Sequence, residues 1–234
     1  MDEKKTVEAL RQIKQILEEH NVEFWLSCGV LLGAVREKKI IPWDHDIDLA
    51  TWDQNISKIK QAFNDIKNRG FEIYYSDFQQ IIKILKEESE IEIALHTLKD
   101  NKAIIPVYMH NKIGQILDYI NWTLIIKNPK IKPGKAPLIL TTAIIKTFQI
   151  MPISLRKNLI KLTKKLYQKI GCKKAHAIIP SHFFTNLSTM EFYEMKFKAP
   201  KDAEGYLSYI YGKDWRTPKK DYVFHRDDNS IVKE

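Results

Sequence analysis

Apolar and polar positions follow two different periods along the first half of the chain. Apolar residues spaced three and four apart predict amphipathic helices over 4–20 and 54–69, the second ending at Gly70. Shorter apolar runs between and after them are typical of strands. The predicted strands cover 24–26, 47–50, 71–75, 80–85, 91–98 and 103–108, and a short helix covers 30–37. This order predicts an α/β (α+β) fold with a small mixed sheet flanked by helices.

The second half of the chain has a different character. Pro129, Pro133 and Pro137 mark a loop, and the apolar segment 138–151 and the basic segment 154–170 follow it. We therefore divide the chain into a core, 1–127, and a helical and basic C-terminal portion, 128–234. We expect the second part to pack on the core and to complete the substrate site.

Segment 154–170 predicts a basic amphipathic helix. Leu155, Leu159, Leu162 and Leu166 recur at helical spacing among lysines and one arginine. One interpretation is a core helix with a solvated lysine face. The other is a peripheral contact with an anionic membrane, since lysine-rich amphipathic helices bind anionic leaflets.

The overall charge favours anionic partners. The net charge is +9, which suits nucleotides, nucleic acid or anionic headgroups alike. The lysines are spread along the chain without a helix-turn-helix or an RNP-like aromatic pattern, so a sequence-reading nucleic-acid binder is disfavoured. Two distant cysteines and no apolar signal core at the N-terminus indicate a cytoplasmic protein, with peripheral membrane contact if 154–170 binds lipid. No apolar run reaches the ~18 residues of a transmembrane helix.

Residues 27–48 carry the candidate chemistry. Gly29 stands at a strand-to-helix junction, where backbone N–H groups and the helix N-terminus receive phosphate. Asp46 and Asp48 are two residues apart on a predicted strand, so their carboxylates project to the same face. The apolar neighbours Ile47 and Leu49 argue against a merely solvated strand edge, because buried unpaired carboxylates are costly. Hard oxygen ligands in this arrangement suit Mg²⁺ or Mn²⁺.

The same residues carry a family resemblance. The chain resembles the LicD family, which includes fukutin and fukutin-related protein. The resemblance rests on two adjoining runs and covers residues 20–60. These runs are Gly29-x-Leu31-Leu32-Gly33-x-x-Arg36 and Ile41-Pro42-Trp43-Asp44-x-Asp46-x-Asp48. A weaker likeness to the family's C-terminal block returns at Tyr211-Gly212-x-x-Trp215-x-Thr217-Pro218, while 100–180 matches nothing in the family.

The resemblance implies a nucleotidyltransferase-like (polymerase-beta-type) fold that uses a divalent metal. Members of the family transfer a phospho-alcohol, such as phosphocholine or ribitol phosphate, from a CDP-linked donor to a sugar hydroxyl. The implied acceptor is a cell-surface glycan or lipid-linked saccharide, for example lipopolysaccharide or a teichoic-acid-like polymer. Neither the alcohol nor the acceptor can be chosen from the residues.

The resemblance also implies roles for individual residues. Asp46 and Asp48 would hold the metal and take part in catalysis. The fold supplies a third carboxylate from a neighbouring strand, and Glu92 is the first choice as metal ligand or general base. Glu90 has the same strand parity and stays open as the alternative. His96, on the Glu92 face, either lines the site or lies in the core.

Donor binding is expected at two places in the chain. In the first motif, Arg36 would reach a phosphate or pair with Asp44, while Trp43 and Asp44 brace the loop before the strand and His45 points away. Near the C-terminal block, a basic cluster is either a solvated surface or part of the donor or acceptor site. The donor-binding residues are predicted to be Gly29, Gly33, Arg36, Trp43, Asp44, Arg216 and Lys219, the last two within a cluster that also holds Lys213, Lys220, His225 and Arg226.

Two other functions compete with phospho-alcohol transfer. A nucleotidyltransferase of the same fold would move a nucleoside monophosphate from an NTP to a small-molecule or macromolecular hydroxyl, with Trp25, Trp43 or Trp52 stacking on the base. A non-catalytic binding module would have lost its ligands. The paired Asp46 and Asp48 argue against the second of these.

Overall fold

The computed structural model describes residues 2–125 and 138–233 of the 234-residue chain. The loop expected at 128–137 lies outside the described residues. The helices are α1 Glu3–Glu19, α2 Cys28–Arg36, α3 Ile56–Asn68, α4 Lys112–Ile125, α5 Leu138–Ile150, α6 Ile153–Leu166, α7 His182–Thr185, α8 Ala203–Tyr211 and α9 Phe224–Asp227, with a short 3₁₀ turn η1 at Asp53–Asn55 and a π turn η2 at Tyr167–Gly171. The strands are β1 Trp25–Leu26, β2 Ile47–Trp52, β3 Glu72–Ser76, β4 Ile81–Lys86, β5 Ser89–Lys99, β6 Lys102–His110, β7 Cys172–Pro180, β8 Leu187–Phe192, β9 Met195–Pro200 and β10 Ile231–Lys233.

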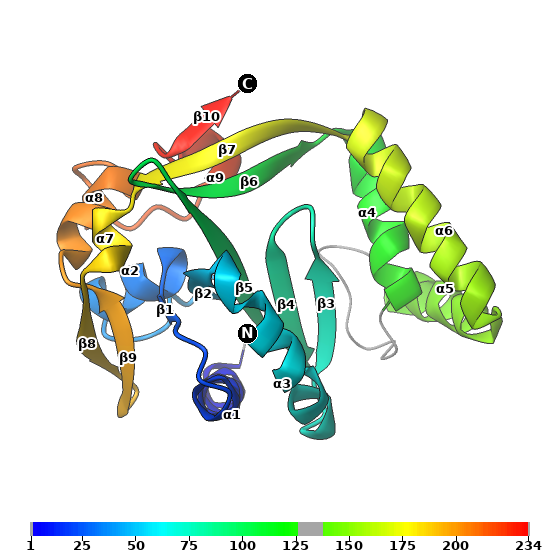
Figure 1. The fold of residues 1–234 in the computed structure, drawn as a ribbon, viewed down its shortest axis with the longest axis horizontal. Helices are drawn as coiled ribbons and strands as arrows, with labels where there is room; N and C mark the ends of the chain where they lie inside the picture. The colour runs from blue at the N-terminus through cyan, green and yellow to red at the C-terminus, as the bar shows by residue number, and fades with distance from the viewer. Residues whose placement is uncertain (1, 126–137, 234) are drawn as a thin grey trace.

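These strands form one mixed sheet. Its order is β10-β7-β6-β5-β2-β1-β9-β8, and β4 pairs with β5 and carries β3. The β2–β5 and β1–β9 pairs are parallel, whereas the other pairs are antiparallel. The predicted mixed sheet flanked by helices is confirmed. Helices α4, α5 and α6 gather at one end of the molecule, where β6 and β7 lead to them, and α2, α7 and α8 lie at the other end (Figure 1).

The predicted elements up to β6 are confirmed with small shifts at their ends. Helix α1 follows an amphipathic pattern that buries Leu10, Ile13 and Leu17 completely, and the Asp2 side chain caps its first turn by accepting from the Lys5 N–H. Helix α2 begins at Cys28, one residue before Gly29, so the glycine lies in the first helical turn.

Two parts of the chain differ from the sequence prediction. Helix α4 was not predicted at all, and the prediction of a helical C-terminal portion is incomplete because β7 to β10 follow α6. Strand β7 faces the core with Ala175, Ala177 and Ile179, and alanines give a weak strand signal. A domain boundary near 127 stays a prediction.

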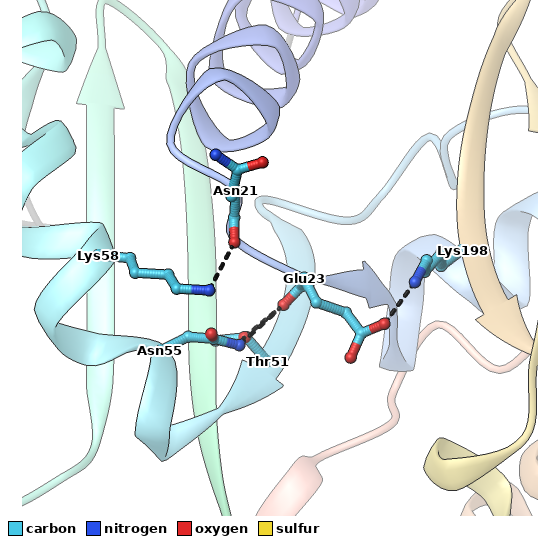
Figure 2. Close-up of polar contacts among 6 residues, drawn as sticks. All are labelled: Asn21, Glu23, Thr51, Asn55, Lys58 and Lys198. Atoms are coloured by element: carbon cyan, nitrogen blue, oxygen red, sulfur yellow. Dashed lines mark hydrogen bonds and ion pairs between the residues drawn. The ribbon is translucent and has the colours of Figure 1, made fainter.

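The link from α1 to β1 is fastened by polar contacts that converge on Glu23 (Figure 2). The Glu23 carbonyl accepts from Thr51 Oγ1 at 2.5 Å and from Asn55 Nδ2 at 3.4 Å. Its carboxylate forms an ion pair with Lys198 of β9. The entry to β1 is therefore tied to both of the strands that flank β1, β2 and β9.

The core is centred on an aromatic cluster around Trp25. Its ring stacks on Phe184 with centroids 5.2 Å apart and contacts Trp52 at 5.3 Å and His96 at 5.6 Å. His96 is 1% exposed, and its Nδ1 has no hydrogen-bond partner among the described residues. Burial lowers the pKa of His96 to about 3. His96 is therefore a neutral core residue and does not line the site.

This histidine predicts a defined loss of stability in acid. The unfolded chain takes up a proton at His96 below about pH 6.5, whereas the folded chain does so only near pH 3. The stability that neutral His96 contributes above pH 6.5 is thus lost as the pH falls towards 3, on the order of 4 kcal/mol at most. In a pH profile of the free energy of unfolding in urea, this loss forms a falling limb between pH 6.5 and pH 3. We expect His96→Phe to make that limb shallower. His225→Phe, at an exposed histidine, should leave the limb unchanged, and an unchanged limb in His96→Phe would contradict the prediction.

Across residues 2–125 and 138–233, none of the helices combines the length and the apolarity needed to cross a membrane.

Candidate functional site

Strand register brings the predicted acidic residues together. Strands β2 and β5 run parallel with Asp48 opposite Glu92. Asp46 precedes β2 by one residue, and Glu90 lies two residues before Glu92 on the same face of β5. One carboxylate oxygen from each of Asp46, Glu90 and Glu92 lies within 4.8 Å of the others. Both candidates for the third carboxylate are therefore beside Asp46.

Asp48 is held at the start of α2. Its Oδ2 accepts a hydrogen bond of 2.9 Å from the Gly29 N–H, and the positive end of the helix dipole favours a carboxylate there. A Cβ on Gly29 would lie 2.3 Å from Asp44 Oδ2 and 3.1 Å from Asp48 Oδ2. The glycine therefore lets two acidic side chains, Asp44 and Asp48, approach the first turn of the helix closely. Its role in binding phosphate stays a prediction.

The crowding makes the site strongly electronegative. Burial, then Glu92 and Asp44, raise the pKa of Asp46 to about 7. Burial, then Asp46 and Glu92, raise the pKa of Asp48 well above its ordinary range, and burial raises that of Asp44. Carboxylates in this state gain a proton or a cation readily. The arrangement thus fits a cation-binding site made of hard oxygen ligands.

Lys83 of β4 meets this cluster from the neighbouring strand. It lies opposite Glu92, and its Nζ is 2.9 Å from Glu92 Oε2 and 2.6 Å from Glu90 Oε1. Burial opposes its charge, but Glu92 and Glu90 outweigh burial and raise the pKa of Lys83. The sequence analysis missed this residue. The only signal was a charged residue inside the apolar run of β4, between Ile82 and Ile84.

Removing the Lys83 charge is expected to strengthen cation binding at the cluster. In Lys83→Met, the metal-free protein should lose about 1–3 kcal/mol of stability because Glu90 and Glu92 lose their partner. Affinity for Mg²⁺ should rise about tenfold, since the ammonium no longer competes for the same oxygens. Calorimetric titration with Mg²⁺ and thermal melts with and without EDTA measure both effects. Lys86→Met on the same strand is the matched control, and a weaker Mg²⁺ affinity in Lys83→Met would contradict this account.

A cavity of about 270 Å³ adjoins the acidic cluster. It is lined by two segments far apart in the chain, the first motif and the C-terminal block. The first motif contributes Gly29, Leu32, Arg36, Ile41, Trp43, Asp44 and His45, and the C-terminal block contributes Tyr211, Trp215, Thr217, Lys219, Lys220 and Tyr222. The two regions that carried the resemblance therefore share one cavity.

Several predicted donor-binding residues are held in place at this cavity. Arg36 forms an ion pair with Glu37 at 2.7 Å and donates to the Trp215 carbonyl at 3.2 Å, so its guanidinium is neither solvated nor paired with Asp44. Lys220 Nζ lies 5.3 Å from the centre of the Trp43 ring. Lys219 pairs with Asp214 at 2.8 Å.

Two predicted residues lie outside the cavity lining. Arg216 is exposed, pairs with Glu204 at 2.6 Å and stacks on Trp215. A Cβ on Gly33 would lie 2.5 Å from the Lys39 carbonyl, so this glycine serves the close packing of α2 on the following loop.

Tyr206 of α8 supports the turn before α2. Its hydroxyl lies 2.8 Å from Ser27 Oγ and 3.4 Å from the backbone N of Cys28, which has a positive φ of 41°. Tyr206 is fully buried. The sequence analysis did not single out this residue, because nothing local shows that it meets a turn 178 residues away.

The resemblance to a known family is supported by a match to that family's model. Residues 21–115 match the family model described as LicD/FKTN/FKRP, nucleotidyltransferase domain. This stretch, about two fifths of the chain, is similar to the nucleotidyltransferase domain of the LicD family. It contains Gly29, Asp46, Asp48, Lys83 and Glu92, and so holds the whole acidic cluster of the site. The resemblance expected from the sequence is confirmed over these residues, and the mixed sheet flanked by helices that it implied is the fold observed.

Individual relatives match over short stretches. Ribitol 5-phosphate transferase FKRP of Homo sapiens is 38% identical over 69 residues, which is 27% of this chain and 14% of that protein. The uncharacterized protein RP689 of Rickettsia prowazekii is 28% identical over 74 residues, 32% of this chain and 28% of the relative. The matches thus span less than a third of either relative's own length.

Among solved structures, the antibiotic-resistance factor ANT(2'')-Ia matches 72% of this chain and 96% of its own, at 14% identity and a TM-score of 0.35. Its crystal structure in complex with adenylyl-2''-tobramycin matches 70% and 99%, at 13% identity and a TM-score of 0.34.

Proposed function

We propose that this protein is a metal-dependent phosphotransferase that moves a phospho-alcohol from a CDP-linked donor to a sugar hydroxyl. The observation that carries the proposal is the parallel register that sets Asp48 opposite Glu92 within the residues that match the LicD family model. Phosphoryl transfer depends on positioning and on neutralising charge more than on covalent chemistry. A buried cluster of carboxylates beside a helix N-terminus is suited to that task.

The proposed cofactor is Mg²⁺ or Mn²⁺. Asp46 and Asp48 would hold it, with Glu92 or Glu90 as the third carboxylate. The fit rests on the carboxylate oxygens of Asp46, Glu90 and Glu92, which lie within 4.8 Å of one another, and on the pKa of Asp46, which burial and the neighbouring carboxylates raise. Asp48 is not one of these three, and its proposed part rests on its position opposite Glu92. When bound, such an ion would neutralise diphosphate charge on the donor and leaving group.

The cavity beside the cluster is the proposed donor site. Its 270 Å³ is below the usual 300–1,000 Å³ of a complete ligand pocket, about enough for one end of a nucleotide-linked donor. Trp43 offers a ring face, and Arg36, Lys219 and Lys220 bring positive charge near the phosphates. Trp25 and Trp52 are buried in the core, so only Trp43 of the three tryptophans considered for base stacking faces this cavity.

Glu92 is the proposed base for the acceptor hydroxyl. Its strand places it next to Asp48, and Lys83 holds one carboxylate oxygen in position. The acceptor is proposed to be a cell-surface glycan or a lipid-linked saccharide, modified on the cytoplasmic side. FKRP's description as a ribitol 5-phosphate transferase supports a polyol phosphate as one candidate group.

Product analysis tests the proposal. The purified chain is incubated with β-³²P-labelled CDP-choline, CDP-ribitol or CDP-glycerol, or with α-³²P-labelled NTPs, each with Mg²⁺ or EDTA. Cell-envelope glycan and lipid-linked saccharide serve as acceptors. Label from a CDP-alcohol on the acceptor, with release of CMP and only with Mg²⁺, supports the proposal. Label from NTPs alone favours the nucleotidyltransferase alternative. A donor-induced shift in Tm without transfer from any donor favours a non-catalytic binding module.

A further inference from the structure

One segment of the chain is strongly basic. Residues 138–174 contain nine basic residues and no Asp or Glu. Taking those nine from the chain's 38 basic residues leaves 29, which the 29 acidic residues balance. The segment covers α5, α6 and η2, so the charge lies on the helical end of the molecule, away from α2 and α8 (Figure 1).

Helix α6 exposes its leucines and buries polar atoms. Leu155 and Leu162 are each 54% exposed and Leu166 is 37% exposed. Thr163, in contrast, is buried and donates to Asn121 Oδ1 of α4 at 2.5 Å. The face of α6 that packs on α4 is therefore not the face that carries these leucines. The core-helix interpretation does not explain why these leucines are exposed.

The exposed leucines form one stripe. Residues 155, 162 and 166 are seven and four positions apart, a spacing that places them on the same side of a helix. Apolar residues extend the exposed surface at both ends of α6. These are Ile150, 83% exposed, before the helix, Ile153, 63% exposed, at its first residue, and Ile170, 48% exposed, after it.

A row of cations borders this stripe. Lys161, Lys165 and Lys169 follow one another at four-residue intervals on the adjoining side of α6 and η2, and all three are exposed. An apolar stripe beside a lysine row is the arrangement of a helix that lies in a membrane interface. Its apolar side chains enter the headgroup boundary, and the lysines reach the anionic phosphates.

We propose that α6, with Ile150 and Ile153 at its start, docks on an anionic lipid surface. The charge and the exposed leucines of this helix favour a lipid surface over a second copy of this chain or nucleic acid. A second copy of this chain would bring another segment without acidic residues against the first, and the two would repel each other. Nucleic acid would engage the lysines but would not cover the leucines. Docking through this end leaves α2 and α8, which contribute residues to the cavity lining, at the opposite end of the molecule (Figure 1).

Vesicle flotation with the full chain tests the proposal. The probes are vesicles of phosphatidylcholine with 25% phosphatidylglycerol and vesicles of phosphatidylcholine alone. One variant is Leu155→Gln/Leu162→Gln, and another is Lys161→Glu/Lys165→Glu. The controls are Leu98→Gln, which alters a leucine with the same 54% exposure at another site, and Lys67→Glu/Lys201→Glu, which makes the same charge change at exposed positions elsewhere.

We expect the wild type and both controls to float with the anionic vesicles and not with the neutral ones. Each α6 variant should lose at least tenfold in partitioning while keeping the wild-type Tm. Full binding by the leucine variant would overturn the proposal in favour of a general polyanion contact. Failure of the wild type to float, or a dimer in solution that the leucine variant abolishes, would also overturn it. None of these measurements depends on the transfer reaction, so they stand apart from the proposed function.

Discussion

Asp46→Asn and Asp48→Asn are expected to lose transfer activity by a factor on the order of 10² to 10³ or more while becoming more stable without metal. Both substitutions keep the shape of the side chain. Each removes an ionisable carboxyl group from a cluster in which burial and neighbouring carboxylates raise the pKa values of Asp46 and Asp48. Relief of that repulsion should raise the Tm of the metal-free protein at pH 7, and the loss of ligand charge should weaken Mg²⁺ binding.

Two measurements separate these effects. Thermal melts in EDTA report the relief of repulsion, and transfer rates over a Mg²⁺ titration report the loss of the site. Asp100→Asn, in the exposed turn between β5 and β6, is the control, because Asp100 has a positive φ of 50° that asparagine also adopts readily. Wild-type turnover with unchanged Mg²⁺ dependence in Asp46→Asn would rule out the proposed metal site.

Gly114→Ala is expected to destabilise the protein by about 3 kcal/mol. The added Cβ would lie 1.8 Å from the Gly171 carbonyl oxygen and 2.7 Å from its carbonyl carbon. Both are backbone atoms, so η2 would have to move away from α4. The same carbonyl accepts from the Asn111 N–H at 3.0 Å, and Asn111 Oδ1 accepts from the Gly114 N–H at 2.8 Å. The clash would therefore disrupt the contact that attaches α6 and η2 to α4.

The sign of this effect is informative. Helix propensity alone favours alanine over glycine by about 1 kcal/mol, so an uncrowded helix would gain stability. Urea unfolding of Gly114→Ala beside Gln115→Ala, the exposed neighbour in the same helix, distinguishes the two cases. A stabilised Gly114→Ala would show that α4 and η2 do not approach as closely as these distances state.

Much of the site was predictable because its parts are local. A strand alternates its side chains, and the spacing of Asp46 and Asp48 assigned them to one face. Strand β2 begins at Ile47, so Asp46 lies just before it, and the shared metal site stays a prediction. The glycine at the start of α2 and the amphipathic patterns of α1 and α3 are equally local signals. The motif from Gly29 to Asp48 was long enough for the family to be recognised, and the match over 21–115 bears this out.

Other residues could not be predicted because their roles depend on distant partners. Lys83 matters only because β4 and β5 pair in a register that places it opposite Glu92. Tyr206 reaches Ser27 from a helix near the other end of the chain. His96 has the parity of Glu92, yet tertiary packing places it among Trp25 and Phe184.

By itself, then, the sequence of this protein determined the type of most elements before residue 110 and the family that residues 21–115 resemble, and it predicted the pair of aspartates in the proposed site. Only the tertiary structure decided which third carboxylates stand beside Asp46, where Lys83 lies and how the C-terminal block closes the cavity. The physical reason is the separation along the chain over which each signal acts. Periodicity reflects the geometry of a single backbone segment, whereas strand register and helix packing are chosen by contacts between segments that the sequence separates.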